Sequence, residues 1–218
     1  MALEIKQGTL ELVNHLPILQ VITPMLIAPI LVVLNNKTLS WLLSFLGALA
    51  CLFISILLMQ TVSDGSILTY YLGGWVPPIG IEYRIDAANS ILLFLISIIS
   101  AIVLIFSYSS LHAEIPEEKH TLFYSCFLLC LTGLLGVVAT ADIFNVFVFL
   151  EISSLSTYVL VAQGAYLDRR ALSASFNYLI MGTIGATFFV IGIGYIYMAT
   201  GSLNMMYIEE RVSQIGDN

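Results

Sequence analysis

The sequence predicts an all-α membrane protein with about six transmembrane helices and an extramembrane β-hairpin between the second and third helices. Two observations support this fold class. Hydrophobic residues make up 59% of the 218 residues and charged residues only 10%, whereas soluble domains carry roughly 25% charged residues. The mean hydropathy is +0.99. The same numbers exclude an ordinary soluble domain, and seven scattered Lys and Arg residues exclude a nucleic-acid-binding stripe.

Six apolar runs are long enough to cross a bilayer, since a transmembrane helix needs about 20 predominantly apolar residues. The expected spans are residues 16–34, 39–59, 87–108, 121–139, 143–162 and 171–200. The chain is thereby divided into an extramembrane N-terminal segment (1–15), a membrane domain (16–202) and an amphipathic tail (203–218). The tail has apolar and charged residues in a pattern typical of an interfacial helix.

The β-hairpin is expected over residues 66–86. Ile79, Ile81, Tyr83 and Ile85 alternate with Gly80, Glu82, Arg84 and Asp86. This period of two is typical of a strand. The stretch from Ile67 to Trp75 is rich in β-branched and aromatic residues and supplies a second strand. An irregular loop is the alternative.

The distribution of basic residues predicts the orientation in the membrane. Lys37, Lys119, Arg169 and Arg170 fall in loops on one side, and Lys6, Arg84 and Arg211 fall on the other. Because short cytoplasmic loops carry an excess of Lys and Arg, we expect the first group in the cytoplasm and the hairpin outside.

Cofactor and metal sites are not predicted. Cys51, Cys126 and Cys130 all fall within apolar runs, so they do not form a secreted disulfide framework. Cys126 and Cys130 share a helix face, but packing is favoured over metal binding because no His or carboxylate is near them in the sequence.

Glu151 is the candidate functional residue. It lies nine residues after Asp142 in the fifth span, which places it roughly 13 Å from the helix start and near the middle of a hydrocarbon core about 30 Å thick. A charge there costs from about 3 to more than 10 kcal/mol. A carboxyl group in this position binds a proton or faces water or a cation. We therefore interpret Glu151 as a proton relay rather than as a permanently protonated residue that joins two helices.

Three further residues in the fifth span have predicted supporting roles. Ser154 and Tyr158 lie one and two turns beyond Glu151 on the same helix face, where they can hydrogen-bond it or hold water. Asp142 precedes the helix and is expected to cap it, which is a structural role.

Small residues in the sixth span are expected to allow close helix packing, which is favoured over a gating bend. They are Gly182, Gly185, Ala186, Gly192 and Gly194.

Four stretches resemble one known family. Residues 141–158 read ADIFNVFVFLEISSLSTY and look like the acid-bearing fifth helix of the antiporter-like membrane subunits. Residues 71–86 (YLGGWVPPIGIEYRID), 178–187 (YLIMGTIGAT) and 200–205 (TGSLNM) are also similar to that family. It comprises the D subunits of Mrp-type cation/proton antiporters and the proton-pumping subunits of complex I, and the sequence here is nearer to the Mrp D subunits.

The resemblance implies a multi-pass protein of the inner (plasma) membrane of a prokaryote, not itself an enzyme. It would be a subunit of a multisubunit Na⁺ or K⁺/proton antiporter, with Glu151 as the family's intramembrane glutamate. The alternatives are a proton-translocating subunit of a complex-I-like NADH-quinone oxidoreductase and a truncated or split-gene fragment without transport of its own. Expected partners are other membrane subunits, the lipid bilayer, protons and monovalent cations. Family members have about fourteen helices, including an intramembrane lysine that these six spans lack.

Overall fold

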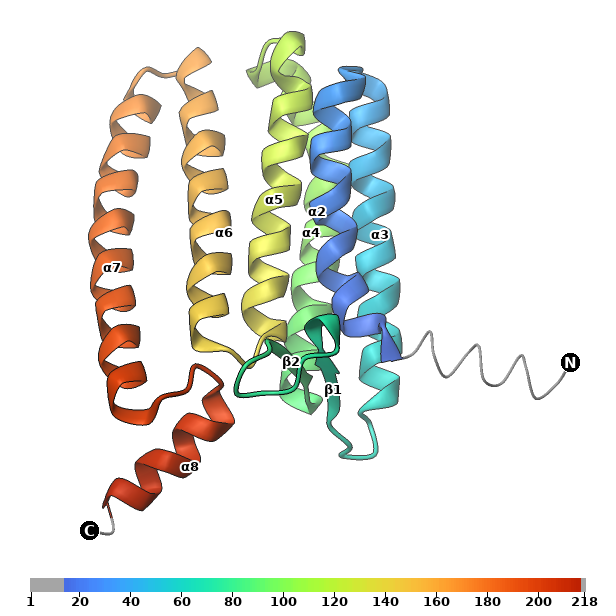
Figure 1. The fold of residues 1–218 in the computed structure, drawn as a ribbon. Helices are drawn as coiled ribbons and strands as arrows, with labels where there is room; N and C mark the ends of the chain where they lie inside the picture. The colour runs from blue at the N-terminus through green and yellow to red at the C-terminus, as the bar shows by residue number, and fades with distance from the viewer. Residues whose placement is uncertain (1–13, 217–218) are drawn as a thin grey trace, which may run out of the picture.

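The computed structural model describes residues 14–216, and long helices make up most of them (Figure 1). Six helices are long and apolar enough to cross a membrane, which confirms the predicted fold class. They are α2 (Leu16–Leu34), α3 (Lys37–Thr61), α4 (Ala87–Glu114), α5 (His120–Ala139), α6 (Ile143–Gln163) and α7 (Arg170–Thr200). A shorter helix, α8 (Met205–Gly216), follows. The expected N-terminal segment lies almost wholly outside the described residues.

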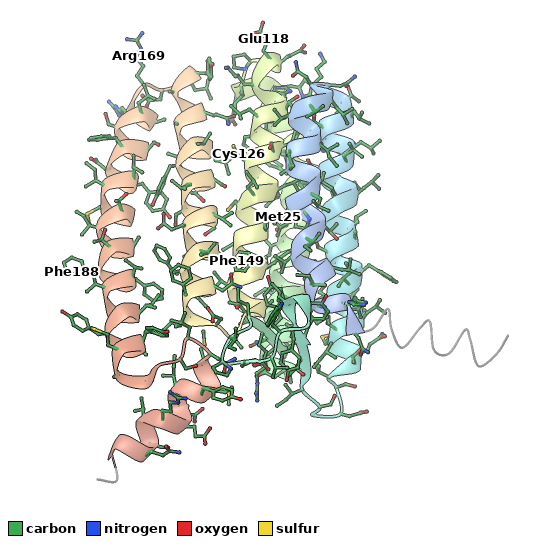
Figure 2. All side chains as sticks on the ribbon, in the orientation of Figure 1. Met25, Glu118, Cys126, Phe149, Arg169 and Phe188 are labelled. Carbon is green, nitrogen blue, oxygen red and sulfur yellow. The ribbon has the colours of Figure 1, made fainter. Side chains whose placement is uncertain are left out.

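Four of the six long helices form a bundle, and the other two extend it on one side. Helices α2 to α5 pack against one another, α6 packs on α5, and α7 packs on α6 at one side of the molecule (Figure 1). Helix α7 is the least covered of the six. Phe188 projects from it away from the other helices (Figure 2) and is 70% exposed. Most of the α7 surface is therefore free to meet lipid or another protein.

The two helix ends on either side of the first loop show why the chain turns there. Asn35 ends α2 in the left-handed conformation, with φ of 43°, and Asn36 caps α3 by accepting a hydrogen bond from the backbone N–H of Leu39. Asparagine tolerates both positions because its short polar side chain bonds locally to the backbone.

The predicted hairpin is confirmed. Strands β1 (Leu68–Tyr71) and β2 (Glu82–Ile85) pair antiparallel, with Tyr70 opposite Tyr83. The second strand is shorter than the alternation indicated, and Ile79 lies in the connecting loop with 82% of its surface exposed. Between the strands, the short 3-10 turn η1 (Leu72–Gly74) contains Gly73 and Gly74 at positive φ, where glycine is the least strained residue.

The α5–α6 contact is closer than the sequence indicated. A Cβ atom on Gly133 would lie 2.6 Å from the backbone oxygen of Phe149, and one on Gly136 would overlap the Phe149 ring. Phe149 points from α6 toward α5 (Figure 2). The predicted packing role of small residues was thus placed partly on the wrong helix. Open space surrounds Gly185, Gly192 and Gly194, and of the α7 glycines only Gly182 meets a neighbour.

The three cysteines lie in packed surroundings. Cys51 and Cys126 are buried, and the Cys130 sulfur lies 3.4 Å from the Thr157 hydroxyl oxygen. No cluster of three or more His, Cys, Asp and Glu side chains suited to a metal ion occurs within residues 14–216.

The basic loops predicted to share one side do lie together. Lys37 forms an ion pair with Glu117, and Figure 2 shows Arg169 and Glu118 at the same end of the helices. Which end faces the cytoplasm stays a prediction.

Candidate functional site

Glu151 lies in a groove of about 280 Å³ between α6 and α7. The groove has four residues from each helix. Its lining consists of Phe147, Leu150, Glu151 and Ser154 from α6 and Gly182, Gly185, Ala186 and Phe189 from α7. The small α7 residues leave this space open because they have no large side chains to fill it. Glu151 is partly buried there, with apolar side chains on both sides.

The Glu151 carboxylate has no hydrogen bond or ion pair with any other described residue, 14–216. Ser154 lines the same groove, as its position one turn further on predicted. In the middle of a bilayer, an acid without a protein partner is stable only when it is protonated or in contact with water or a cation. The groove provides space for several water molecules at about 30 Å³ each.

Tyr158 has a different environment from Glu151 and Ser154. It is 7% exposed, its ring packs edge-on against Tyr178, and its backbone oxygen accepts a hydrogen bond of 2.8 Å from the Ser175 hydroxyl. Its hydroxyl lies so close to Gly182 that a Cβ atom there would approach the hydroxyl oxygen to 1.8 Å. Tyr158 therefore joins α6 to α7 beyond the groove, and no hydrogen bond connects it to Glu151 in the described structure.

Asp142 occupies the N-cap of α6. Its carboxylate accepts a 2.8 Å hydrogen bond from the backbone N–H of Asn145. Burial raises the pKa of the Asp142 carboxyl, although hydrogen bonds from the backbone of Asn145 and Phe144 act in the opposite direction. This geometry agrees with the structural role expected from the sequence.

The start of α6 is held in a junction that sequence reasoning missed. The backbone N–H of Ala141 donates to the oxygen of Glu82 in β2, and the N–H of Met205 donates to the oxygen of Ala141, both at 2.9 Å. The N–H of Ile143 donates to the oxygen of Leu203 at 2.9 Å. Three segments distant in the sequence thus form one small extended array beneath the helices.

The β2 strand contributes side chains to the same junction. Tyr83 is 2% exposed and its ring contacts Phe149 of α6. Burial raises the pKa of Tyr83 to about 12, partly offset by a hydrogen bond with Asn145. Glu82, which the alternation placed on a polar face, is only 6% exposed because the segment between α7 and α8 covers it. The sequence held one signal that this segment has a structural role. Asn204 comes immediately before the last helix, and asparagine is a preferred N-cap residue.

Comparison with known proteins places this fold and sequence among membrane subunits. Residues 140–218 match the family described as NADH:quinone oxidoreductase/Mrp antiporter, TM. The chain is 41% identical to the N subunit of NADH-quinone oxidoreductase of Desulforudis audaxviator, over 88% of this chain and 38% of that protein. It is 31% identical to the D subunit of the Na(+)/H(+) antiporter of Bacillus subtilis, over 93% of this chain and 40% of that protein.

Solved structures of membrane complexes share the fold, and two of them illustrate this. One is the membrane-bound sulfane sulfur reductase, an archaeal respiratory membrane complex, which matches with a TM-score of 0.78 and 32% identity over 90% of this chain and 39% of that chain. The other is the Mrp complex from Dietzia sp., with a TM-score of 0.76 and 22% identity over 88% of this chain and 36% of that chain.

The chain is therefore related to the antiporter-like membrane subunits, as the sequence resemblance indicated. It spans about 40% of the length of the curated relatives that it matches. The relatives include both an N subunit of the oxidoreductase and a D subunit of an antiporter, so the expected preference for the Mrp D subunits over the complex I subunits stays a prediction.

Proposed function

We propose that this chain is a membrane subunit of a multisubunit monovalent cation/proton antiporter of a prokaryotic plasma membrane, and that Glu151 relays protons through it. The observation that carries the proposal is the position of this carboxylate. Across the six membrane helices, Glu151 is the one acidic or basic residue more than a turn from a helix end. It faces an open groove.

The chemistry of the groove supports a group that changes its protonation state. A carboxylate surrounded by Phe147, Leu150 and Phe189 is costly when it is ionised, so a dry groove favours the protonated acid. Water or a cation entering the groove favours the ionised form. A proton is then taken up and released as the contents of the groove change, which is the property that a relay requires.

A proton-translocating subunit of a complex-I-like oxidoreductase is the second candidate. The 41% identity to a protein named as the N subunit of an NADH-quinone oxidoreductase favours it. Glu151 would serve the same purpose in either assembly. Purification of the native complex distinguishes the two, since copurifying hydrophilic redox subunits support the oxidoreductase and their absence from an intact complex supports the antiporter.

The proposal is tested by replacing Glu151 in the assembled complex and measuring proton flux in membrane vesicles. Glu151→Gln preserves shape and hydrogen bonding but removes the titrating group, so we expect it to abolish transport at an unchanged protein level. Glu151→Asp keeps the carboxyl group one methylene shorter and is expected to retain partial activity. Ser154→Ala is the matched control in the same groove and is expected to be milder. Parental flux in a well-assembled Glu151→Gln complex would refute the relay.

A further inference from the structure

Glu82 is a buried acid far from the groove that carries Glu151. Its carboxylate accepts a 2.8 Å hydrogen bond from the side-chain amide of Asn204, and both residues are almost fully buried, at 6% and 1% exposure. No ion pair with Glu82 occurs within residues 14–216. A buried carboxylate costs free energy unless its oxygens are hydrogen-bonded, so the amide of Asn204 is a significant partner.

Both polar atoms of the Asn204 side-chain amide form hydrogen bonds. Its nitrogen donates to Glu82, while its oxygen accepts from the backbone N–H of Met206 at 3.1 Å and thereby caps α8. The residue also forms an antiparallel bridge with Asp142, the residue that caps α6. Asn204 therefore connects the segment after α7 to the hairpin and to the first residues of α6.

Helices α6 and α7, which form the two walls of the groove, are both held at this junction. We call it one of the two anchors of the groove. Helix α6 starts directly after Asp142, and α7 ends at Thr200, four residues before Asn204. The other anchor is the Tyr158 contact with Ser175 and Gly182. Glu151 lies between the anchors, roughly 13 Å from Asp142 and 10 Å from Tyr158 at 1.5 Å per residue. Loosening either anchor changes the separation of α6 and α7 at the groove.

We propose that Glu82 is a positioning residue for Glu151. Through its hydrogen bond to Asn204 it fixes the end of α7 against the hairpin and the start of α6, and this sets how far the groove opens to water. The importance of Glu82 for transport rests on the proposed relay function of Glu151. The effect of Glu82 on the opening of the groove is tested without any transport measurement.

The test measures the opening of the groove with a reporter cysteine. Gly185→Cys is introduced into the full complex with the three native cysteines replaced by alanine, because nothing lies within 4 Å of a Cβ atom at this position. The rate of reaction with a small, charged methanethiosulfonate reagent then reports water access. Leu167→Cys, exposed in the loop before α7 at the opposite end, is the control that no variant should affect.

Three variants distinguish the effect of the Glu82–Asn204 hydrogen bond from the effects of the Glu82 carboxyl group and of the α8 cap. Asn204→Asp keeps the oxygen that caps α8 but replaces the donor to Glu82 with a second carboxylate. We expect it to raise the Gly185→Cys labelling rate roughly threefold to tenfold, the size of effect that follows from losing one ordinary hydrogen bond. Glu82→Gln retains an acceptor for Asn204 and should label at the parental rate.

Combining Glu82→Gln with Asn204→Asp reverses the donor and the acceptor and is expected to restore the parental labelling rate. If Asn204→Asp does not accumulate, Asn204→Ser removes the amide donor while its hydroxyl still caps α8, and it should show the raised rate. A parental labelling rate in assembled Asn204→Asp or Asn204→Ser complexes overturns the proposal. A labelling rate that stays raised in the combined variant also overturns it. Normal transport by Glu151→Gln would instead overturn the relay and leave the labelling result standing.

Discussion

The tight approach of α5 and α6 predicts a large effect from adding one methyl group. In Gly133→Ala, the new Cβ atom would lie 2.6 Å from the backbone oxygen of Phe149 and 2.7 Å from the backbone nitrogen of Ser153. Ordinary van der Waals contact begins at 3.4 Å, so the helices must separate by about 0.8 Å. Backbone atoms cannot turn aside as a flexible side chain can. Overpacking of this kind destabilises by about 1–3 kcal/mol.

The assay is thermal unfolding of the purified protein in detergent, followed by circular dichroism. Gly185→Ala is the matched control, since it adds the same methyl group where no atom lies within 4 Å. It should be neutral or stabilise by up to about 1 kcal/mol, because alanine has the higher helix propensity. If Gly133→Ala and Gly185→Ala unfold at the same temperature as the parent, the close α5–α6 contact described here is wrong.

Three other predictions concern the orientation of the hairpin, transport by this chain without other subunits, and the α6 cap. A cysteine at Ser66 should react with an impermeant thiol reagent in intact cells and one at Ala165 should not; the reverse pattern would show that the hairpin faces the cytoplasm. Vesicles with only this chain should show no cation-dependent proton flux, because no lysine lies in the interior of its membrane helices; measurable flux would contradict this. The pKa of Asp142 in the folded protein is raised above its ordinary value of 3.8. The stability that its protonated form contributes is therefore lost as the pH rises through the raised pKa. Asp142→Asn should therefore gain stability relative to the parent as the pH rises above 3.8; a difference in unfolding temperature that stays constant with pH would refute this.

The helices and the hairpin were predictable from the sequence because their signals are local. Runs of apolar residues determine where a chain can cross a membrane, and α6 begins at Ile143 as the position of Asp142 indicated. Alternation identified β2, but it could not show that a second segment covers Glu82, since that segment lies 122 positions further along the chain.

The candidate site was only partly predictable. The isolated acid at position 151 stands out because the surrounding sequence is apolar, and the 3.6-residue period brings Ser154 to its side. The period also brings Tyr158 to that face, yet its hydroxyl rests on Gly182. Which helix a side chain meets depends on how helices are placed in space, and helical period alone does not determine this. The same reason explains why Gly133 and Gly136 were missed.

The central claim, that Glu151 changes its protonation state within the groove, is tested most directly by infrared difference spectroscopy of the assembled complex. Spectra recorded during a pH titration of the parent should contain a carbonyl band of a protonated carboxyl group that disappears as the pH rises. We expect this band to be absent from Glu151→Gln, and to be retained but shifted in Glu151→Asp. A titrating band of equal intensity in the parent and in Glu151→Gln would contradict the claim.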